Sequence, residues 1–317
     1  MKICFLMDPL ESINPEKDTT YALMLSAHQK GHEIYFVARQ SISILNGEVI
    51  LSAIKVIPCN ISDKLFEQEQ QLTLTQHDID IVFIRTDPPF NEAYLMDTWL
   101  LDRLKGVYVI NQPSGLRTVN EKVWATQFTD CVPKTLVSAS KDQIDQFIDQ
   151  MRTVIVKPVN MFGGAGIFKL NKTDTNRQVI IETSTHYHTK EIIVQDYIHD
   201  STVGDKRILL LGGEPIGAIL RVHSESDHRN NLFAGGTTKS TTITDNDQRI
   251  INQLKPHLIE LGLDFVGIDI MGDYLIEVNV TSPTCLQEMD RSDGVDRAAL
   301  VIDFAIKKAL QDRVLSS

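Results

Sequence analysis

The first 115 residues alternate short apolar runs with helix-like stretches, and this rhythm constrains the fold more than any other feature of the chain. Apolar runs predict buried strands, and Gly31 marks the end of the first helix. The predicted elements are strands at 3–7, 33–37, 79–84 and 107–110 and helices at 18–30 and 92–104. Strands that alternate with helices predict an open α/β sheet with parallel pairing.

The pattern changes after about residue 115, where a smaller mixed lobe is predicted. Its expected elements are a helix from about residue 121, a strand at 135–137, a helix at 143–151 and a strand at 154–156. The glycine-rich segment 163–166 then leads to a strand at 167–170, which predicts a hairpin with a long tip. Such a tip could close over a ligand.

Two more hairpins are expected beyond residue 200. Strands at 207–211 and 218–222 flank Gly212 and Gly213, and strands at 265–270 and 274–278 flank Gly272 and Asp273. Helices at about 245–261 and 295–310 should cover the back of this antiparallel sheet. The third lobe is therefore predicted to be α+β.

Composition excludes several classes of protein. A chain of 317 residues should divide into lobes, and a net charge of −11 without a dense basic run argues against nucleic acid and anionic lipid as partners. The four cysteines, Cys4, Cys59, Cys131 and Cys285, have no metal-like spacing and suggest reduced thiols. Neither a signal peptide nor a membrane-spanning run is evident, so we expect a cytoplasmic protein that binds small molecules.

Three polar side chains at the last hairpin form the strongest chemical pattern. Asp269 ends one strand, and Glu277 and Asn279 alternate onto one face of its partner. Two carboxylates and an amide are hard oxygen donors of the type that Mg²⁺ prefers when it also binds phosphate. An ordinary hairpin with a wet polar face is the alternative, but the apolar neighbours of these residues suggest burial, where unpaired charge is costly.

A second pattern indicates a site for phosphate. Lys157 ends an apolar strand and needs an anion, and the glycines that follow could donate backbone N–H groups to phosphates. Taken alone, the glycines are consistent with a plain turn and Lys122 with a solvated lysine. Arg207 and Arg221 lie within apolar strands, where a guanidinium requires a fixed carboxylate or phosphate partner.

Two other chemistries find no support. The histidines of His186-Tyr187-His188 could suggest zinc, but two histidines without a third ligand fit a wet polar loop. No nucleophile motif of a covalent hydrolase is present. Transfer on a metal-bound nucleotide suits these residues better.

Seven segments taken together resemble the bacterial glutathione synthetases, nearly from end to end. They are Met7-Asp8-Pro9, Arg85-Thr86-Asp87-Pro88-Pro89-Phe90, Asn120-Glu121-Lys122, Lys157-Pro158, Gly163-Gly164-Ala165, Gly204-Asp205-Lys206-Arg207 and the stretch from Glu277 to Cys285. The lysine and metal pattern is shared with the wider ATP-grasp superfamily. The Asp-Pro-Pro-Phe and Asn-Val-Thr-Ser-Pro-Thr-Cys segments are specific to this family, so the resemblance rather than the spacing implies the substrate.

The resemblance implies a role for each site residue. The ATP contacts implied are Lys122, Lys157, Gly163, Gly164, Ala165, Gly166, Gln195, Asp196, Tyr197, Ile198 and Asn279. The substrate contacts implied are Asp8, Arg85, Asp87, Arg207, Arg221, Arg229 and Ser282, with Arg207, Arg221 and Lys157 also catalytic. Asp269, Glu277 and Asn279 would hold Mg²⁺, or Mn²⁺ in its place. The stretch 222–236, with Arg229 and Asn231, would be a mobile loop over the site.

The same resemblance implies an architecture and a reaction. An N-terminal α/β domain of the pre-ATP-grasp type at 1–119 would precede a two-lobed α+β ATP-grasp domain, with a small lobe at 120–200 and a C-terminal lobe at 201–317. The enzyme would use ATP to join γ-glutamylcysteine to glycine through an acyl phosphate, yielding glutathione, ADP and phosphate. Family analogy adds a homotetramer.

Two departures from the family pattern and three competing interpretations remain. Asn160 stands where an acidic residue is frequent, and residues 227–231 replace a more glycine-rich stretch, so loop mobility and turnover rate are the properties in question. The chain could instead be another ATP-grasp ligase, such as a D-alanine ligase or a glutamate-adding enzyme, or a nucleotide-binding regulator without turnover. A NAD-dependent dehydrogenase is disfavoured because no glycine fingerprint follows the first strand.

Overall fold

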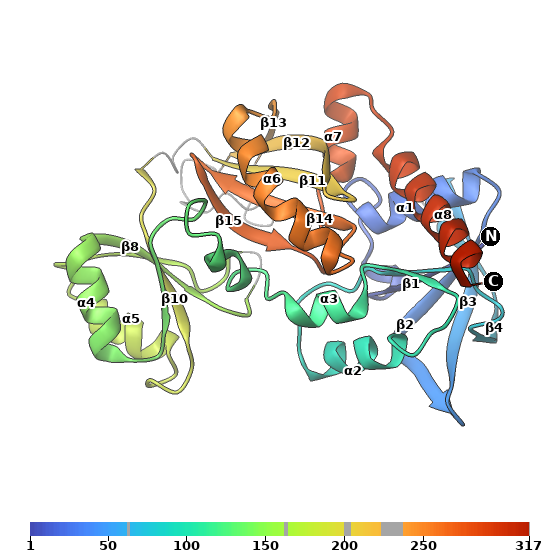
Figure 1. Cartoon of the computed structure of the whole chain (residues 1–317), viewed down its shortest axis with the longest axis horizontal. Coiled ribbons are helices and arrows are strands. Elements are labelled where there is room, and N and C mark those ends of the chain that lie inside the picture. The colour runs from blue at the N-terminus through green and yellow to red at the C-terminus, as the bar shows by residue number, and fades with distance from the viewer. Residues whose placement is uncertain (62–63, 162–163, 200–203, 223–236, 317) are drawn as a thin grey trace.

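The computed structural model describes residues 1–61, 64–161, 164–199, 204–222 and 237–316, in which three sheets follow one another along the chain (Figure 1). The N-terminal sheet has the strand order β4-β3-β2-β1-β5-β6. Its strands are β1 (Lys2–Met7), β2 (Glu33–Leu45), β3 (Glu48–Ile61), β4 (Lys64–Thr75), β5 (Ile81–Ile84) and β6 (Tyr108–Ile110). The parallel pairing of β1 with β2 and β5, and of β5 with β6, confirms the predicted open α/β sheet.

Short polar side chains define where the first two long helices begin. The Asp18 carboxylate accepts the backbone N–H of Tyr21 at 2.7 Å at the start of α1 (Thr19–Gln29), and Asn91 caps α2 (Glu92–Leu101) in the same way. Each cap satisfies a backbone donor that has no partner within the helix. A short helix, α3 (Pro113–Thr118), was not predicted and follows β6.

The β2-β3-β4 meander extends the sheet beyond the prediction. β2 continues to Leu45, and β3 and β4 were not predicted at all. β4 lies at the edge of the sheet, and most of its side chains are polar and exposed. Such a strand lacks the alternation of apolar and polar residues that makes a half-buried strand visible in a sequence.

The small lobe has a sheet and a hydrophobic core of its own. Its strands β7 (Thr135–Ser138), β8 (Thr153–Pro158), β9 (Phe168–Asn171) and β10 (Ile192–Asp196) lie in the order β7-β10-β8-β9. α4 (Lys141–Met151) and α5 (Arg177–Ser184) cover one face through a cluster that includes Ile144, Ile181 and Val194. Antiparallel pairing of β8 with β9 confirms the predicted glycine hairpin.

The third sheet consists of the two predicted hairpins and a further edge strand. Its strands β11 (Asp205–Leu211), β12 (Glu214–Val222), β13 (Thr237–Ser240), β14 (Phe265–Met271) and β15 (Tyr274–Asn279) lie in the order β13-β12-β11-β14-β15. The predicted helix is α6 (Asp245–Glu260), and its Ile250 and Leu254 share a core with Ile268 of β14. α7 (Leu286–Asp293) was not predicted.

The C-terminal helix α8 (Arg297–Ser316) does not simply cover the third sheet as expected. Val301 and Ala305 pack in one cluster with Ile3 and Phe5 of β1, and α8 lies beside α1 (Figure 1). The same cluster reaches Phe265 of β14, so the helix joins the first and third sheets. These two sheets therefore share hydrophobic cores, whereas the core of the small lobe is separate.

The helix expected from about residue 121 does not form. Only a single 3₁₀ turn, η2 (Trp124–Gln127), forms there. The flanking backbone instead bonds to β15, with Leu275 N–H donating to Cys131 O and Val278 N–H to Glu121 O. Helical residues would have used these carbonyls internally.

No described helix is long and apolar enough to span a bilayer.

Candidate functional site

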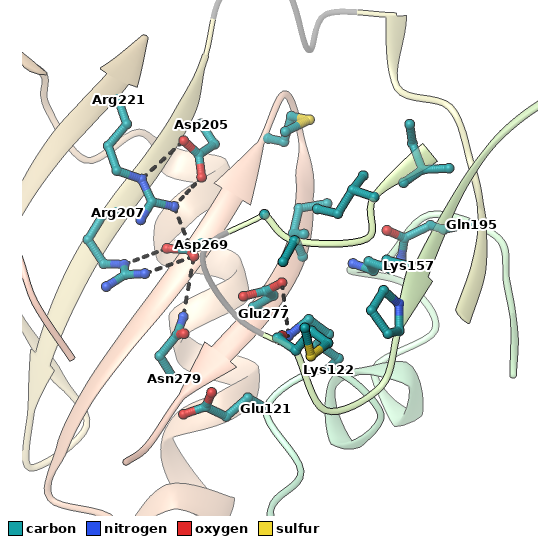
Figure 2. Close-up of a pocket in the computed structure, with 18 of the residues that line it drawn as sticks. Glu121, Lys122, Lys157, Gln195, Asp205, Arg207, Arg221, Asp269, Glu277 and Asn279 are labelled. Atoms are coloured by element: carbon teal, nitrogen blue, oxygen red, sulfur yellow. Dashed lines mark hydrogen bonds and ion pairs between the residues drawn. The ribbon is translucent and has the colours of Figure 1, made fainter. Parts of the chain in front are cut away.

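A cavity of about 270 Å³ lies between the small-lobe sheet and the third sheet. Lys157 of β8 and Gln195 of β10 line it on one side, and Asp269 of β14 and Glu277 of β15 line it on the other (Figure 2). Residues from strands far apart in the sequence therefore converge on one space. The cavity also lies where the separate small-lobe core meets the rest of the molecule.

The acidic wall has the arrangement that period-two geometry predicts. Asp269 is the direct antiparallel partner of Glu277, and Asn279 lies two residues further along β15. Paired residues and those two apart share a face of the sheet. The Asn279 Nδ2 donates to Asp269 Oδ2 at 3.3 Å, so the three side chains form one polar surface.

Two arginines surround the Asp269 carboxylate. Arg207 Nη2 and Arg221 Nη2 each lie 2.9 Å from Asp269 Oδ2, and all three side chains are buried. Burial opposes ionisation of Asp269, but attraction to the two guanidinium groups outweighs it and lowers the pKa of this carboxyl well below its usual range. The two guanidinium groups therefore favour the ionised form of Asp269, and both arginines also face the cavity.

Sequence reasoning missed Asp205, which extends this network. Arg221 Nε donates to Asp205 Oδ1 at 3.1 Å, and its Nη2 also contacts the same carboxylate. Asp205 lines the cavity, and burial raises its pKa despite the neighbouring Arg221. The Gly204-Asp205-Lys206-Arg207 segment could have revealed it, because Asp205 pairs with Arg221 in the β11–β12 hairpin.

Lys157 and Lys122 add two further positive charges near the acidic wall. Lys157 is 3% exposed, and burial lowers the pKa of its ammonium to about 8. Lys122 Nζ lies 3.6 Å from Glu277 Oε1 and donates to Met161 O at 2.6 Å. Neither lysine occupies a freely solvated position, which favours the interpretation of both as anion-binding groups.

The predicted adenine hinge lines the small-lobe side of the cavity. Gln195, Asp196, Tyr197 and Ile198 all line it. Gln195 Nε2 donates to Thr135 Oγ1 at 2.9 Å, which fixes its amide, and Lys169 Nζ lies 3.7 Å from the Tyr197 ring centroid. Lys169 was not predicted to contribute.

The glycine segment lies partly at the cavity. Gly164 and Ala165 line it, whereas Gly166 is described but is not part of the lining. Gly163 lies outside the described residues, as do Arg229, Asn231 and the stretch 223–236 of the predicted mobile loop. His186, Tyr187 and His188 are exposed in the turn after α5, away from the cavity lining.

The predicted substrate contacts Asp8, Arg85 and Asp87 of the N-terminal lobe and Ser282 of the C-terminal lobe fall into two groups. Asp87 and Ser282 line the cavity, but Asp8 and Arg85 do not. Asp8 Oδ2 accepts the backbone N–H of Asp87 at 2.8 Å. Arg85 is buried, with Nη2 donating to Pro283 O at 2.9 Å and Nε to Thr20 Oγ1 at 3.1 Å.

The chemistry of the acidic wall fits a hard divalent cation that shares its ligands with phosphate. Asp269, Glu277 and Asn279 offer carboxylate and amide oxygens on one sheet face. Within the described ranges, no three His, Cys, Asp or Glu side chains are grouped closely enough to hold a metal ion by themselves. Mg²⁺ is commonly held by one or two carboxylates together with substrate phosphates and water, and the wall matches that pattern.

Two family models together match almost the whole chain. Residues 1–117 match the prokaryotic glutathione synthetase N-terminal domain, and residues 121–294 match the prokaryotic glutathione synthetase ATP-grasp domain. The boundary between the two matches lies at the segment that leads to Lys122.

Individual proteins give the same result. The chain is 41% identical over 322 residues to the glutathione synthetase of Nostoc sp., covering 98% of this chain and 99% of that one. It is 36% identical over 316 residues to the enzyme of Escherichia coli O6:H1, covering 99% and 100%. Among solved structures, the ATP-grasp ligase PsnB complexed with a phosphomimetic variant of its minimal precursor, Mg and ADP has a TM-score of 0.62 at 16% identity, covering 96% and 97%. That likeness concerns the fold.

Proposed function

The chain belongs to the prokaryotic glutathione synthetase family, and we propose that it is an ATP-dependent ligase that joins γ-glutamylcysteine to glycine. The observation that carries the proposal is the convergence of Lys122 and Lys157 with Asp269, Glu277 and Asn279 at one cavity. Cations and oxygen ligands placed together are what transfer of a phosphoryl group between two anions requires.

We assign the nucleotide to the small-lobe side of the cavity. The 195–198 hinge would hold the adenine, and Lys122 and Lys157 would contact the phosphates together with the backbone of the 163–166 segment. Support comes from the burial of Lys157, since an ammonium held out of water gains most from a fixed anion. Gly163 is assigned by sequence alone.

We assign a Mg²⁺ ion, with Mn²⁺ as an alternative, to Asp269, Glu277 and Asn279. Bound there, the ion would neutralise charge on the phosphate oxygens during transfer. Asp269 suits this role because its two arginines keep it ionised.

Arg207 and Arg221 are assigned to the reacting carboxylate and the transferred phosphoryl group. Each guanidinium carries five N–H donors, so pairing with Asp269 leaves donors for a ligand. Burial strengthens such contacts because the local dielectric is low. Arg229, the third arginine proposed to bind substrate, lies outside the described residues.

The reaction then has two balanced steps. A carboxylate oxygen of γ-glutamylcysteine attacks the γ-phosphorus of ATP, and the bond to ADP breaks. The amine of glycine attacks the acyl carbon, phosphate leaves, and the amine loses a proton. Two unit charges about 4 Å apart repel by about 4 kcal/mol at an effective dielectric of about 20, so the lysines and arginines must offset that repulsion.

We place the glutamyl end of the substrate at the carboxyl ends of β1 and β5. The strand order turns at β1, with β2 on one side and β5 on the other, and open α/β sheets bind ligands at such a point. Asp8 follows β1, and Arg85 and Asp87 follow β5. Among the described residues, Arg85 Nη1 is buried without a hydrogen-bond partner. Arg85 would attract the α-carboxylate, and Asp8 and Asp87 the α-ammonium, with Ser282 nearby.

Assembly and location follow from family analogy and from the cysteines. By family analogy we propose a homotetramer. We also propose a cytoplasmic location, because all four cysteines are free and a reducing compartment preserves thiols. Light scattering of the purified protein tests the tetramer directly.

Release of phosphate from ATP tests the proposed reaction. Phosphate should appear only when γ-glutamylcysteine and glycine are both present, in a one-to-one ratio with glutathione. Phosphate release that requires D-alanine or glutamate instead would indicate a different ATP-grasp ligase. ATP binding without turnover in any mixture would indicate a nucleotide-binding regulator.

A further inference from the structure

Residues 121–131 cover the free edge of the strand that carries Glu277 and Asn279. Among the residues that the structure describes, β15 is the last strand of its sheet, so one side of its backbone has no neighbouring strand. Val278 N–H donates to Glu121 O at 2.8 Å, and Leu275 N–H donates to Cys131 O at 2.7 Å. The segment thus takes the place of a partner strand at two positions.

The side chain of Glu121 continues this pairing beyond the end of β15. Its Oε1 accepts Val280 N–H at 3.0 Å, Thr281 N–H at 3.2 Å and Thr281 Oγ1 at 2.8 Å. One carboxylate oxygen therefore binds three donors, while the main-chain carbonyl of the same residue binds a fourth. Burial raises the pKa of Glu121, and the bonds from Thr281 oppose that rise.

The next residue in the chain is the phosphate-binding candidate Lys122. Its backbone N–H donates to Asn120 Oδ1 at 3.1 Å, and its Nζ lies 3.6 Å from Glu277 Oε1. Glu121 and Lys122 are adjacent, and Glu277 and Val278 are adjacent. A bond between Glu121 and Val278 therefore fixes the backbone from which the lysine reaches towards the acidic wall. Figure 2 shows Glu121 beside Asn279 and Lys122 beside Glu277.

We propose that Glu121 is a positioning residue that sets the place of Lys122 relative to Glu277 and Asn279, and so the affinity of the cavity for nucleotide phosphates. The inference rests on the proposed function, because it takes Lys122 as a phosphate contact. Glu121 acts through Lys122, whose backbone it holds in place by its bonds to residues 278–281, without a chemical step of its own.

Binding of a non-hydrolysable ATP analogue with Mg²⁺ to the full chain tests this role. Glu121→Ala should weaken binding by about tenfold, within the range of coupling between residues in contact. Glu121→Gln keeps a carbonyl oxygen that can accept the same donors, and should bind within about threefold of wild type. If Glu121→Ala fails to fold, Glu121→Asp, which keeps the charge but is one methylene shorter, should show the same weakening.

A double-mutant cycle separates positioning from packing. In a Lys122→Ala background, the same change at Glu121 should alter analogue binding by less than about twofold, because its effect passes through the missing lysine. Equal weakening in both backgrounds, or unchanged binding by a folded Glu121→Ala or Glu121→Asp variant, would overturn the proposal. The binding cycle needs no turnover, so it can succeed or fail independently of the ligase activity of the wild type.

Discussion

Lys122 Nζ lies 3.6 Å from Glu277 Oε1, so a lysine from the segment that covers the edge of β15 meets a carboxylate of the same strand at the cavity. The pair joins the group assigned to phosphate with a group assigned to the metal. A nucleotide phosphate that carries Mg²⁺ would satisfy both at once. We therefore expect phosphate binding and metal binding at this site to depend on each other.

Glu277 and Asp269 should respond differently to loss of charge. Glu277→Gln removes a proposed ligand that is partly exposed, so Mg²⁺-dependent turnover should fall strongly while the free energy of unfolding falls less than in Asp269→Asn. Asp269→Asn leaves two buried arginines without their shared carboxylate and should cost about 3–5 kcal/mol of unfolding free energy. Turnover at several Mg²⁺ concentrations and denaturant unfolding measure both effects. Wild-type Mg²⁺ dependence in Glu277→Gln would refute the metal assignment.

Lys122 and Lys157 should each matter to the rate and to nucleotide affinity. Lys122→Ala or Lys157→Ala removes a preorganised positive donor, which costs roughly 10² to 10³ in kcat. Lys172→Ala, at an exposed position after β9, provides the matched control and should behave as wild type. Steady-state kinetics with varied ATP measures all three. If both cavity variants kept normal ATP affinity and turnover, the lysines would be ordinary structural residues.

Nucleotide affinity should depend on pH through Lys157. Burial lowers the pKa of this ammonium to about 8 in the free protein, so it loses its charge as the pH rises through that value. Phosphate favours the charged form, so binding takes up a proton and the Kd should increase with pH above about 8. Calorimetric titration with an ATP analogue between about pH 7 and about pH 9.5 measures this slope. Lys157→Ala should flatten it, and an equal slope in that variant would assign the titration to another group.

The glutamyl site should recognise the α-ammonium of the substrate. Asp87→Asn should lower kcat/KM for γ-glutamylcysteine by about tenfold, as expected for a hydrogen bond to a charged group, with the KM for ATP unchanged. Glutaryl-cysteine lacks that ammonium, so the same variant should lose little activity towards it. Asp142→Asn, on the exposed face of α4, is the matched control. A tenfold loss towards both substrates would place the effect of Asp87 elsewhere.

The sequence predicted those parts of the fold whose signals are local. Glycine-containing turns revealed the β11–β12 and β14–β15 hairpins, and alternation along β15 placed Glu277 and Asn279 on one face. The parallel pairing of β1 with β2 and β5 follows from the alternation of strands and helices.

Several contacts between segments far apart in the chain could not be predicted from the sequence. The 121–131 segment has helix-like composition. Two of its carbonyls nevertheless accept hydrogen bonds from the edge of β15, which lies more than a hundred residues later in the chain. Asp205 becomes part of the site only because β11 pairs with β12 and brings Arg221 opposite it. The position of α8 beside α1 likewise depends on contacts between the two ends of the chain.

Isotope transfer from the substrate carboxylate is the most direct test of the central claim. γ-Glutamylcysteine labelled with ¹⁸O in its cysteinyl carboxylate should pass one labelled oxygen to the phosphate released, because that oxygen bridges carbon and phosphorus in the acyl phosphate. The phosphate is analysed by mass spectrometry after complete reaction with ATP and unlabelled glycine. An acyl phosphate intermediate should leave one ¹⁸O atom in each phosphate formed. Glutathione production with unlabelled phosphate would contradict it.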